Sequence, residues 1–293
     1  MVLAEGNRHS QCAVNNFPEM CGVKSALEWA NVVEEDIPRP LPENVHLIDV
    51  DGNVWPLPLI DSREGGARKR KHTLGACLKT MFGFTDWRRL IVYLEFWISQ
   101  GTTVFLFYIH TVSREVDEVL RIYEQDMSIE IHRIGWGDLP SDLPEDHPNN
   151  PNNNVWMVAQ EAQKNDCMLR LRSRVKYVIT LDTDELIGLG YPKQTTFIQL
   201  LDRYFERGRV ADASGVPGAL VFLHSIATMA PSDTHHPKEL TFREFRNIKL
   251  EHLVYDPWNR SKPIYKPDYI YDAGVHISRG FEEVAFANAV VPA

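Results

Sequence analysis

Between residues 74 and 208 the chain alternates short apolar runs with longer segments whose apolar residues recur at helical spacing. The clearest run, residues 104–109, has no charged interruption, which is typical of a strand buried on both faces. The segment before it predicts a helix, which Gly101 ends, with an apolar face of Trp87, Leu90, Ile91, Leu94 and Trp97. This alternation predicts an α/β fold: a mostly parallel sheet with helices on both faces.

The same pattern continues toward the C-terminus. Ser113 is a predicted helix cap, and we expect a strand at residues 129–134 after that helix. A polar loop at 145–154 leads to a helix at 156–171 and a strand at 176–181. Gly208 closes a further helix, whose apolar face consists of Phe197, Leu200, Leu201 and Tyr204.

Residues 1–72 look like a peripheral segment. Alternation over 45–48 breaks at Asp51-Gly52-Asn53 and resumes at Val54, which predicts a hairpin. The expected organisation is therefore a peripheral segment at 1–72, one main domain at 73–280 and a tail at 281–293.

Composition narrows the function classes. The formal net charge of −9 argues against a nucleic-acid partner, which selects for a basic face. The chain contains no apolar run long enough to span a bilayer, and its N-terminus lacks the pattern of a signal peptide. If the protein works in the secretory pathway, its membrane anchor lies outside this sequence.

The four cysteines leave two interpretations open. Cys12 could pair with Cys21 and Cys77 with Cys167, or all four could be buried free thiols. The sequon at Asn259-Arg260-Ser261 mildly favours a lumenal location.

The segment with the most chemical information is Asp182-Thr183-Asp184, followed by Glu185, at the end of the strand expected at 176–181. Ligands of α/β sheets bind at the carboxyl ends of the strands. Two carboxylates in an i, i+2 pattern suit a hard cation such as Mn²⁺ or Mg²⁺, which would bridge a diphosphate. The alternative is a helix start that favours acidic residues. A second D-x-D, Asp49-Val50-Asp51, is explained by the hairpin turn.

Several segments, in order, resemble glycosyltransferase family 92, formerly a domain of unknown function, in its nematode-type members. The resemblance covers most of the chain. It rests on residues 77–83, residues 87–101, residues 105–108 with Ser113, Asn165-Asp166-Cys167 with Arg170, the D-x-D-E segment, residues 262–267, and Gly274-Val275-His276.

The resemblance implies a GT-A-like fold, with a Rossmann-like nucleotide-sugar-binding half and an acceptor half. It implies an inverting hexosyltransferase that moves galactose from UDP-galactose onto a glycan or glycoprotein acceptor in the Golgi or another secretory compartment. Asp182, Asp184 and His276 would hold Mn²⁺ or Mg²⁺. The nucleotide-sugar would contact Lys79, His110, Asp182, Thr183 and Tyr108, whose alternative role is core packing.

An inverting transferase needs a general base to deprotonate the acceptor hydroxyl. Glu185, Asp256, Asp272 and Asp233 are the candidate carboxylates, and the sequence does not choose among them. Two other functions are weighed against the transferase. One is a catalytically inactive sugar-binding or nucleotide-binding protein of the same fold. The other is a Mg²⁺-dependent phosphohydrolase, which would need a nucleophilic Asp where the opening strand carries Cys77-Leu78-Lys79.

Overall fold

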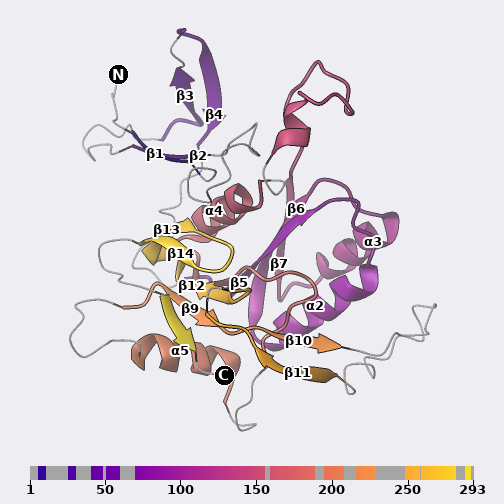
Figure 1. The fold of residues 1–293 in the computed structure, drawn as a ribbon, viewed down its shortest axis with the longest axis vertical. Coiled ribbons are helices and arrows are strands. Elements are labelled where there is room, and N and C mark those ends of the chain that lie inside the picture. Colours follow the sequence, from indigo (N-terminus) through magenta and orange to yellow (C-terminus); the bar gives the residue numbers. More distant parts are fainter. Residues whose placement is uncertain are drawn as a thin grey trace. The chain divides into compact units, whose positions relative to one another are not determined.

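The computed structural model describes residues 6–10, 26–30, 41–48, 51–59, 70–155, 159–188, 195–207, 216–228, 248–257, 259–281 and 288–291. The chain divides into two compact units, one of residues 1–64 with 139–162 and the other of 65–138 with 163–293. The second unit contains a seven-stranded sheet, with helices α2 (Trp87–Ser99) and α3 (Arg114–Tyr123) side by side against it (Figure 1).

The strands of this sheet follow the order β15-β9-β12-β8-β5-β6-β7. Their bounds are β15 (Asn288–Val291), β9 (Ala219–Phe222), β12 (Lys262–Tyr265), β8 (Val175–Ile179), β5 (His72–Met81), β6 (Thr102–Ile109) and β7 (Glu130–Gly135). All neighbouring pairs are parallel except the two that β12 makes, with β8 and β9. The predicted mostly parallel α/β fold is therefore confirmed.

The connections place a topological switch point between β5 and β8. From β5 the chain passes through α2 to β6 and through α3 to β7, moving outward on one side. It returns through α4 (Gln160–Leu171) to β8, which pairs with β5 on the other side. Where the strand order reverses in this way, the carboxyl ends of the two strands leave a crevice that binds ligands.

The sheet separates two hydrophobic cores, because successive strand residues point to opposite faces. Leu74, Ala76 and Leu78 of β5 belong to the core that contains α2, α3 and α5 (Phe197–Arg207). Cys77 of the same strand belongs to the core under α4. At Gly75 a Cβ atom would lie 3.1 to 3.2 Å from three neighbouring side chains, so the glycine lets α4 approach β5 closely.

Local signals explain where the helices begin. The Asp86 side chain accepts a hydrogen bond from the Arg89 backbone at the start of α2. Ser113 caps α3 by accepting one from Val116, as expected. The helix expected at 156–171 is observed as α4 from Gln160, and Gly208 lies outside the described residues.

Smaller elements complete the fold. The predicted hairpin is confirmed as β3 (Asn44–Ile48) and β4 (Val54–Pro58), although Asp49 lies outside the described residues. Further antiparallel pairs are β1 (Gly6–Ser10) with β2 (Ala26–Ala30), β10 (Ser225–Thr228) with β11 (Lys249–Val254), and β13 (Ile270–Ala273) with β14 (Ser278–Phe281). Short 3₁₀ helices span Pro151–Asn154 and Pro267–Tyr269.

The C-terminal segment is part of the main sheet. Strand β15 lies within residues 281–293, which the sequence analysis assigned to a tail, and it joins the main sheet beside β9. In the described part of the chain, no helix has the length and apolarity that crossing a membrane requires.

Candidate active site at the carboxyl ends of β5 and β8

The acidic segment forms a closed turn two residues after β8, which ends at Ile179. The Glu185 backbone N–H donates to the Asp182 carbonyl at 3.1 Å. In return, the Glu185 Oε2 atom accepts from the Asp182 backbone N–H at 3.0 Å. This reciprocal pair fixes Asp182 in the turn. The strand predicted at 176–181 is observed as Val175–Ile179, so two residues separate its end from Asp182.

Two lysines from neighbouring strands ion-pair with Asp182. Lys79 Nζ, near the carboxyl end of β5, lies 3.4 Å from Asp182 Oδ1, and Lys262 Nζ lies 3.3 Å from Oδ2. Because β12 runs antiparallel to β8, its first residue, Lys262, lies at this edge of the sheet. Burial alone would raise the pKa of Asp182, but the charges of Lys262, Lys79 and Lys164 outweigh it and lower the pKa.

Lys262 also reaches the next carboxylate of the turn. Its Nζ lies 3.0 Å from Glu185 Oε2, and its side chain is only 10% exposed. Burial lowers the pKa of Lys262, and the two carboxylates outweigh this effect, so its pKa is raised. Lys262 therefore bridges Asp182 and Glu185 as a fixed ammonium group.

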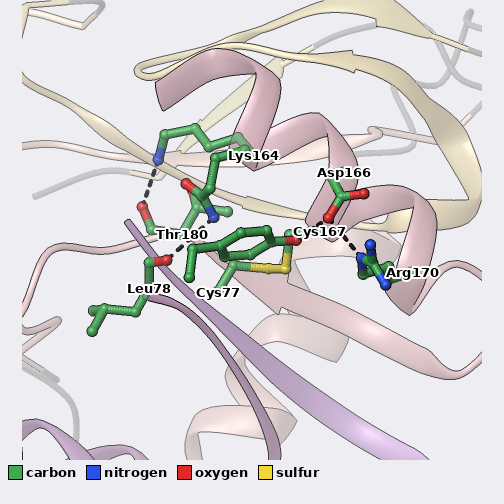
Figure 2. The surroundings of a disulfide bond; sticks show 9 residues. Cys77, Leu78, Lys164, Asp166, Cys167, Arg170 and Thr180 are labelled. Carbon is green, nitrogen blue, oxygen red and sulfur yellow. Dashed lines mark hydrogen bonds and ion pairs between the residues drawn. A yellow bond between two sulfur atoms is a disulfide. The ribbon is translucent and has the colours of Figure 1, made fainter. Parts of the chain in front are cut away.

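A third lysine lies beneath the same strand end. Lys164 of α4 is buried, and its Nζ donates a hydrogen bond to the Thr180 carbonyl at 3.0 Å (Figure 2). Burial and the charge of Lys262 lower its pKa to about 8, against the opposing effect of Asp182 and Glu185.

Helix α4 is held in place by contacts to two strands, β5 and β13. Cys167 forms a disulfide with Cys77 of β5, and the two Cα atoms are 6.2 Å apart. Gln163 donates to the Leu78 carbonyl of β5, and Asn165 exchanges two hydrogen bonds with the Ala273 backbone of β13. The disulfide confirms one of the two interpretations for this cysteine pair, whereas Cys12 and Cys21 lie outside the described residues.

His276 lies in the turn between β13 and β14. Its Nδ1 atom is 2.8 Å from the carbonyl of Ser261, the residue before Lys262. A Cβ atom at Gly274 would lie 2.5 Å from the Ile277 carbonyl oxygen, so this turn requires glycine. Burial is the main cause that lowers the pKa of His276, and the charges of Lys262 and Glu185 both affect it. The imidazole therefore belongs to the neighbourhood of the acidic turn.

This arrangement agrees with a comparison against known protein families. The chain matches the model of glycosyltransferase family 92 over residues 72–290, about three quarters of its length. The chain belongs to glycosyltransferase family 92. It is accordingly a glycosyltransferase, with a sugar donor and an acceptor, and its sheet is consistent with the GT-A-like fold of this family. A search of curated proteins found no match.

Other residues that the family resemblance singled out lie around the same edge. Thr183 is half-buried in the turn, and Asp184 is exposed, with its Oδ2 3.8 Å from Arg89 Nη1. His110 follows β6, where its ring stacks on Phe82 with centroids 4.6 Å apart, and its Nε2 lies 3.0 Å from Asp138 Oδ1. Phe82 is 41% exposed, and the sequence analysis did not single it out for binding.

Tyr108 has a different environment. Its side chain is fully buried, and its hydroxyl donates to Asp166 Oδ2 at 2.5 Å. The ring packs edge-on against Trp136. This geometry agrees with core packing, the second of the two roles considered for Tyr108.

The candidate bases differ in how accessible they are. Asp256 is exposed, in the segment between β11 and β12. Asp272 is buried in β13, where its Oδ1 accepts from Arg279 at 2.9 Å. Glu185 is engaged by Lys262, and Asp233 lies outside the described residues.

The expected metal ligands have suitable chemistry but are not gathered around one point. Among the residues that the structure describes, no three His, Cys, Asp or Glu side chains form a group that could hold a metal ion. Carboxylate oxygens suit Mn²⁺ and Mg²⁺. The Nδ1 contact of His276 with a carbonyl leaves Nε2 free to act as a ligand, as is usual for metal-binding histidines. For an ion to bind at Asp182, the ion pairs of Asp182 with Lys79 and Lys262 would first have to break.

The sequence patterns did not indicate that these lysines converge. Lys262 entered only as the first residue of the segment 262–267, and Lys164 was not among the candidate residues. The available signal was their placement: Lys164 directly precedes the Asn165-Asp166-Cys167 segment, and Lys262 begins an apolar strand.

Proposed function

We propose that this family 92 member transfers galactose from UDP-galactose to a glycan or glycoprotein acceptor, with inversion at the anomeric carbon. The observation that carries the proposal is the position of Asp182. It lies at the switch point between β5 and β8, where lysines from β5 and β12 converge on it. A crevice of this kind with positively charged groups suits the diphosphate of a nucleotide-sugar.

The nucleotide would extend from this point along the edge toward β6. Phe82 and His110 present a stacked aromatic pair there, and stacking on such a surface is a common way to hold a base. Lys79, which is half-exposed, would contact the diphosphate, and Thr183 would contact the donor from the turn.

A divalent ion, Mn²⁺ or Mg²⁺, is part of the proposal. Asp182, Asp184 and His276 would hold it. When bound, the ion would supply positive charge that stabilises the leaving group. The residues of the chain would orient the sugar and receive the acceptor.

Inversion requires one carboxylate to accept the proton of the acceptor hydroxyl as it attacks. Glu185 and Asp272 each hold a cationic partner, Lys262 and Arg279 respectively. Asp256 is exposed and precedes the strand that begins with Lys262. Its accessibility favours Asp256 as the base.

The disulfide and the family point to the secretory pathway, because disulfides persist in oxidising compartments. We place the transferase at a Golgi membrane, where it would meet glycan acceptors.

The proposal is tested by measuring UDP release from UDP-galactose in the presence of Mn²⁺ and a mixture of glycans. The wild-type chain should release UDP only when acceptor is present, and the product should carry the inverted anomeric configuration. Asp182→Asn should lower the rate by about 100-fold or more, since it removes a carboxylate from the donor site.

Asp51→Asn is the matched control, because Asp51 belongs to the other D-x-D segment, in the turn of the hairpin β3–β4. It should retain the wild-type rate. UDP binding without turnover of any glycan would favour the inactive binding protein instead. A retained anomeric configuration would refute inversion.

A further inference from the structure

Three lysines lie around the segment that ends in Asp182, one each from β5, β12 and α4. Lys79 and Lys262 ion-pair with Asp182, Lys262 also pairs with Glu185, and the charge of the buried Lys164 acts on both acids. Nearby, Arg89 lies between two further carboxylates, with its Nε 3.2 Å from Asp86 and its Nη1 3.8 Å from Asp184. Each carboxylate oxygen of Asp182 therefore faces an ammonium group, Lys79 at Oδ1 and Lys262 at Oδ2.

This arrangement favours an anion. A divalent cation needs the carboxylate oxygens as its ligands. At Asp182 a cation must displace two ammonium groups, whereas an anion is attracted by both Lys79 and Lys262. The buried Thr180 hydroxyl, which has no hydrogen-bond partner among the described residues, adds a donor at the same strand end.

We propose that Lys262 and Lys79 bind the diphosphate of the donor directly, so that the chain itself supplies positive charge to the leaving group. This inference rests on the proposed function and deepens it: the diphosphate binds without a divalent ion, and an ion adds to this affinity. Lys164 is a positioning residue, because it is buried and acts through the Thr180 carbonyl and its charge.

Lys262 and Lys79 have different roles in binding the diphosphate. Lys262 is held by Glu185 as well as Asp182, so it stays in place when the donor binds. Lys79 is 54% exposed and ion-pairs with Asp182, so its ammonium group can turn from the carboxylate to a phosphate oxygen. Lys262 therefore provides a preformed contact and Lys79 an adaptable one.

The test is calorimetric titration of UDP, and of inorganic pyrophosphate, into the chain in excess EDTA and again in Mn²⁺. We expect UDP to bind in EDTA, with an affinity that falls as salt is raised. Lys262→Met should weaken that binding by about tenfold or more, because a charge-assisted hydrogen bond is lost. Lys262→Arg should retain part of the wild-type affinity for UDP in EDTA. Lys176→Met is the control, because Lys176 of β8 pairs with Asp202 of α5.

Each outcome has a defined meaning. UDP binding that requires Mn²⁺ would overturn the inference and leave the proposed function standing. Binding in EDTA that is equal for wild type, Lys262→Met and Lys164→Met would also overturn it. No binding of UDP in either buffer would reject both proposals. If Lys262→Met does not fold, UDP binding in EDTA is compared between Lys79→Met and wild type, and wild type is titrated at several salt concentrations. Binding that neither Lys79→Met nor salt weakens would overturn the inference.

Discussion

At the scale of single residues, the charge state of Asp182 depends on its neighbours. Burial disfavours its ionised form, and Lys262, Lys79 and Lys164 reverse that preference. The dependence is mutual, because burial disfavours the charged forms of Lys262 and Lys164 as well. Replacing one member of such a group leaves the others without their counter-charges. The site is therefore a coupled unit, and a substitution at Asp182 changes the lysines too.

A second charged group lies at the opposite ends of the strands. Glu130 of β7 contacts Lys71, His72, His132 and Arg174. Burial raises the pKa of Glu130, but the hydrogen bonds from Lys71, His132 and Arg174 outweigh it and lower the pKa. For His72, burial outweighs Glu130 and lowers the pKa below 6.5.

These shifts predict that stability falls as the pH is lowered. The unfolded chain protonates His72 near pH 6.5, whereas the folded chain resists this, so the contribution of His72 is lost below that pH. The contribution of Glu130 is present above pH 4.5 and is lost at lower pH. The free energy of unfolding, measured with urea, should therefore be lower at pH 5.5 than at pH 7.5.

His72→Gln should reduce this decline, and His276, whose pKa is also lowered, should account for part of what remains. His46→Gln, in the exposed strand β3, is the matched control and should keep the wild-type decline. An unfolding free energy that is equal at the two pH values would contradict the prediction.

At the scale of elements, the disulfide shown in Figure 2 fixes helix α4. The Cys77–Cys167 disulfide joins residues separated by 90 positions and ties β5 to the helix that carries Lys164. Gln163 and Asn165 add hydrogen bonds to β5 and β13. The helix therefore sets the position of the buried positive charge relative to both strand ends.

The double substitution Cys77→Ala with Cys167→Ala should lower the free energy of unfolding by about 2–5 kcal/mol, because it frees a long loop of the unfolded chain. Urea denaturation measures this loss. Met168→Leu, a buried substitution of similar volume on the same helix, should cost less than about 1.5 kcal/mol. An equal free energy of unfolding for the double variant and wild type would show that the disulfide does not stabilise the fold.

Local patterns predict elements better than they predict pairings. Ser113 and the apolar face of Trp87 to Trp97 are local signals, and both helices formed as expected. The strand before Asp182 was predictable because most of its residues are apolar, although β8 ends at Ile179 rather than at residue 181. In contrast, no local pattern shows that β12 inserts antiparallel between β8 and β9, and this pairing is what brings Lys262 to Asp182. Likewise, the spacing of Phe82 and His110 does not reveal that their rings stack.

At the scale of the whole molecule, the topology of the sheet concentrates the site at one edge. The turn after β8, the end of β5, the loop after β6 and the start of β12 all meet there, although they are far apart in sequence. Membership of glycosyltransferase family 92 spans these elements, since the match covers residues 72–290. A donor bound at this edge would contact residues from every one of them.

The most direct test of this account is a crystal structure of the chain with UDP bound. The account predicts that the diphosphate lies between the ends of β5 and β8, within hydrogen-bond distance of Lys79 or Lys262, and that the uracil stacks on Phe82 or His110. Tyr108 should remain buried against Trp136. UDP bound at any other edge of the sheet, or away from Asp182, would contradict the account.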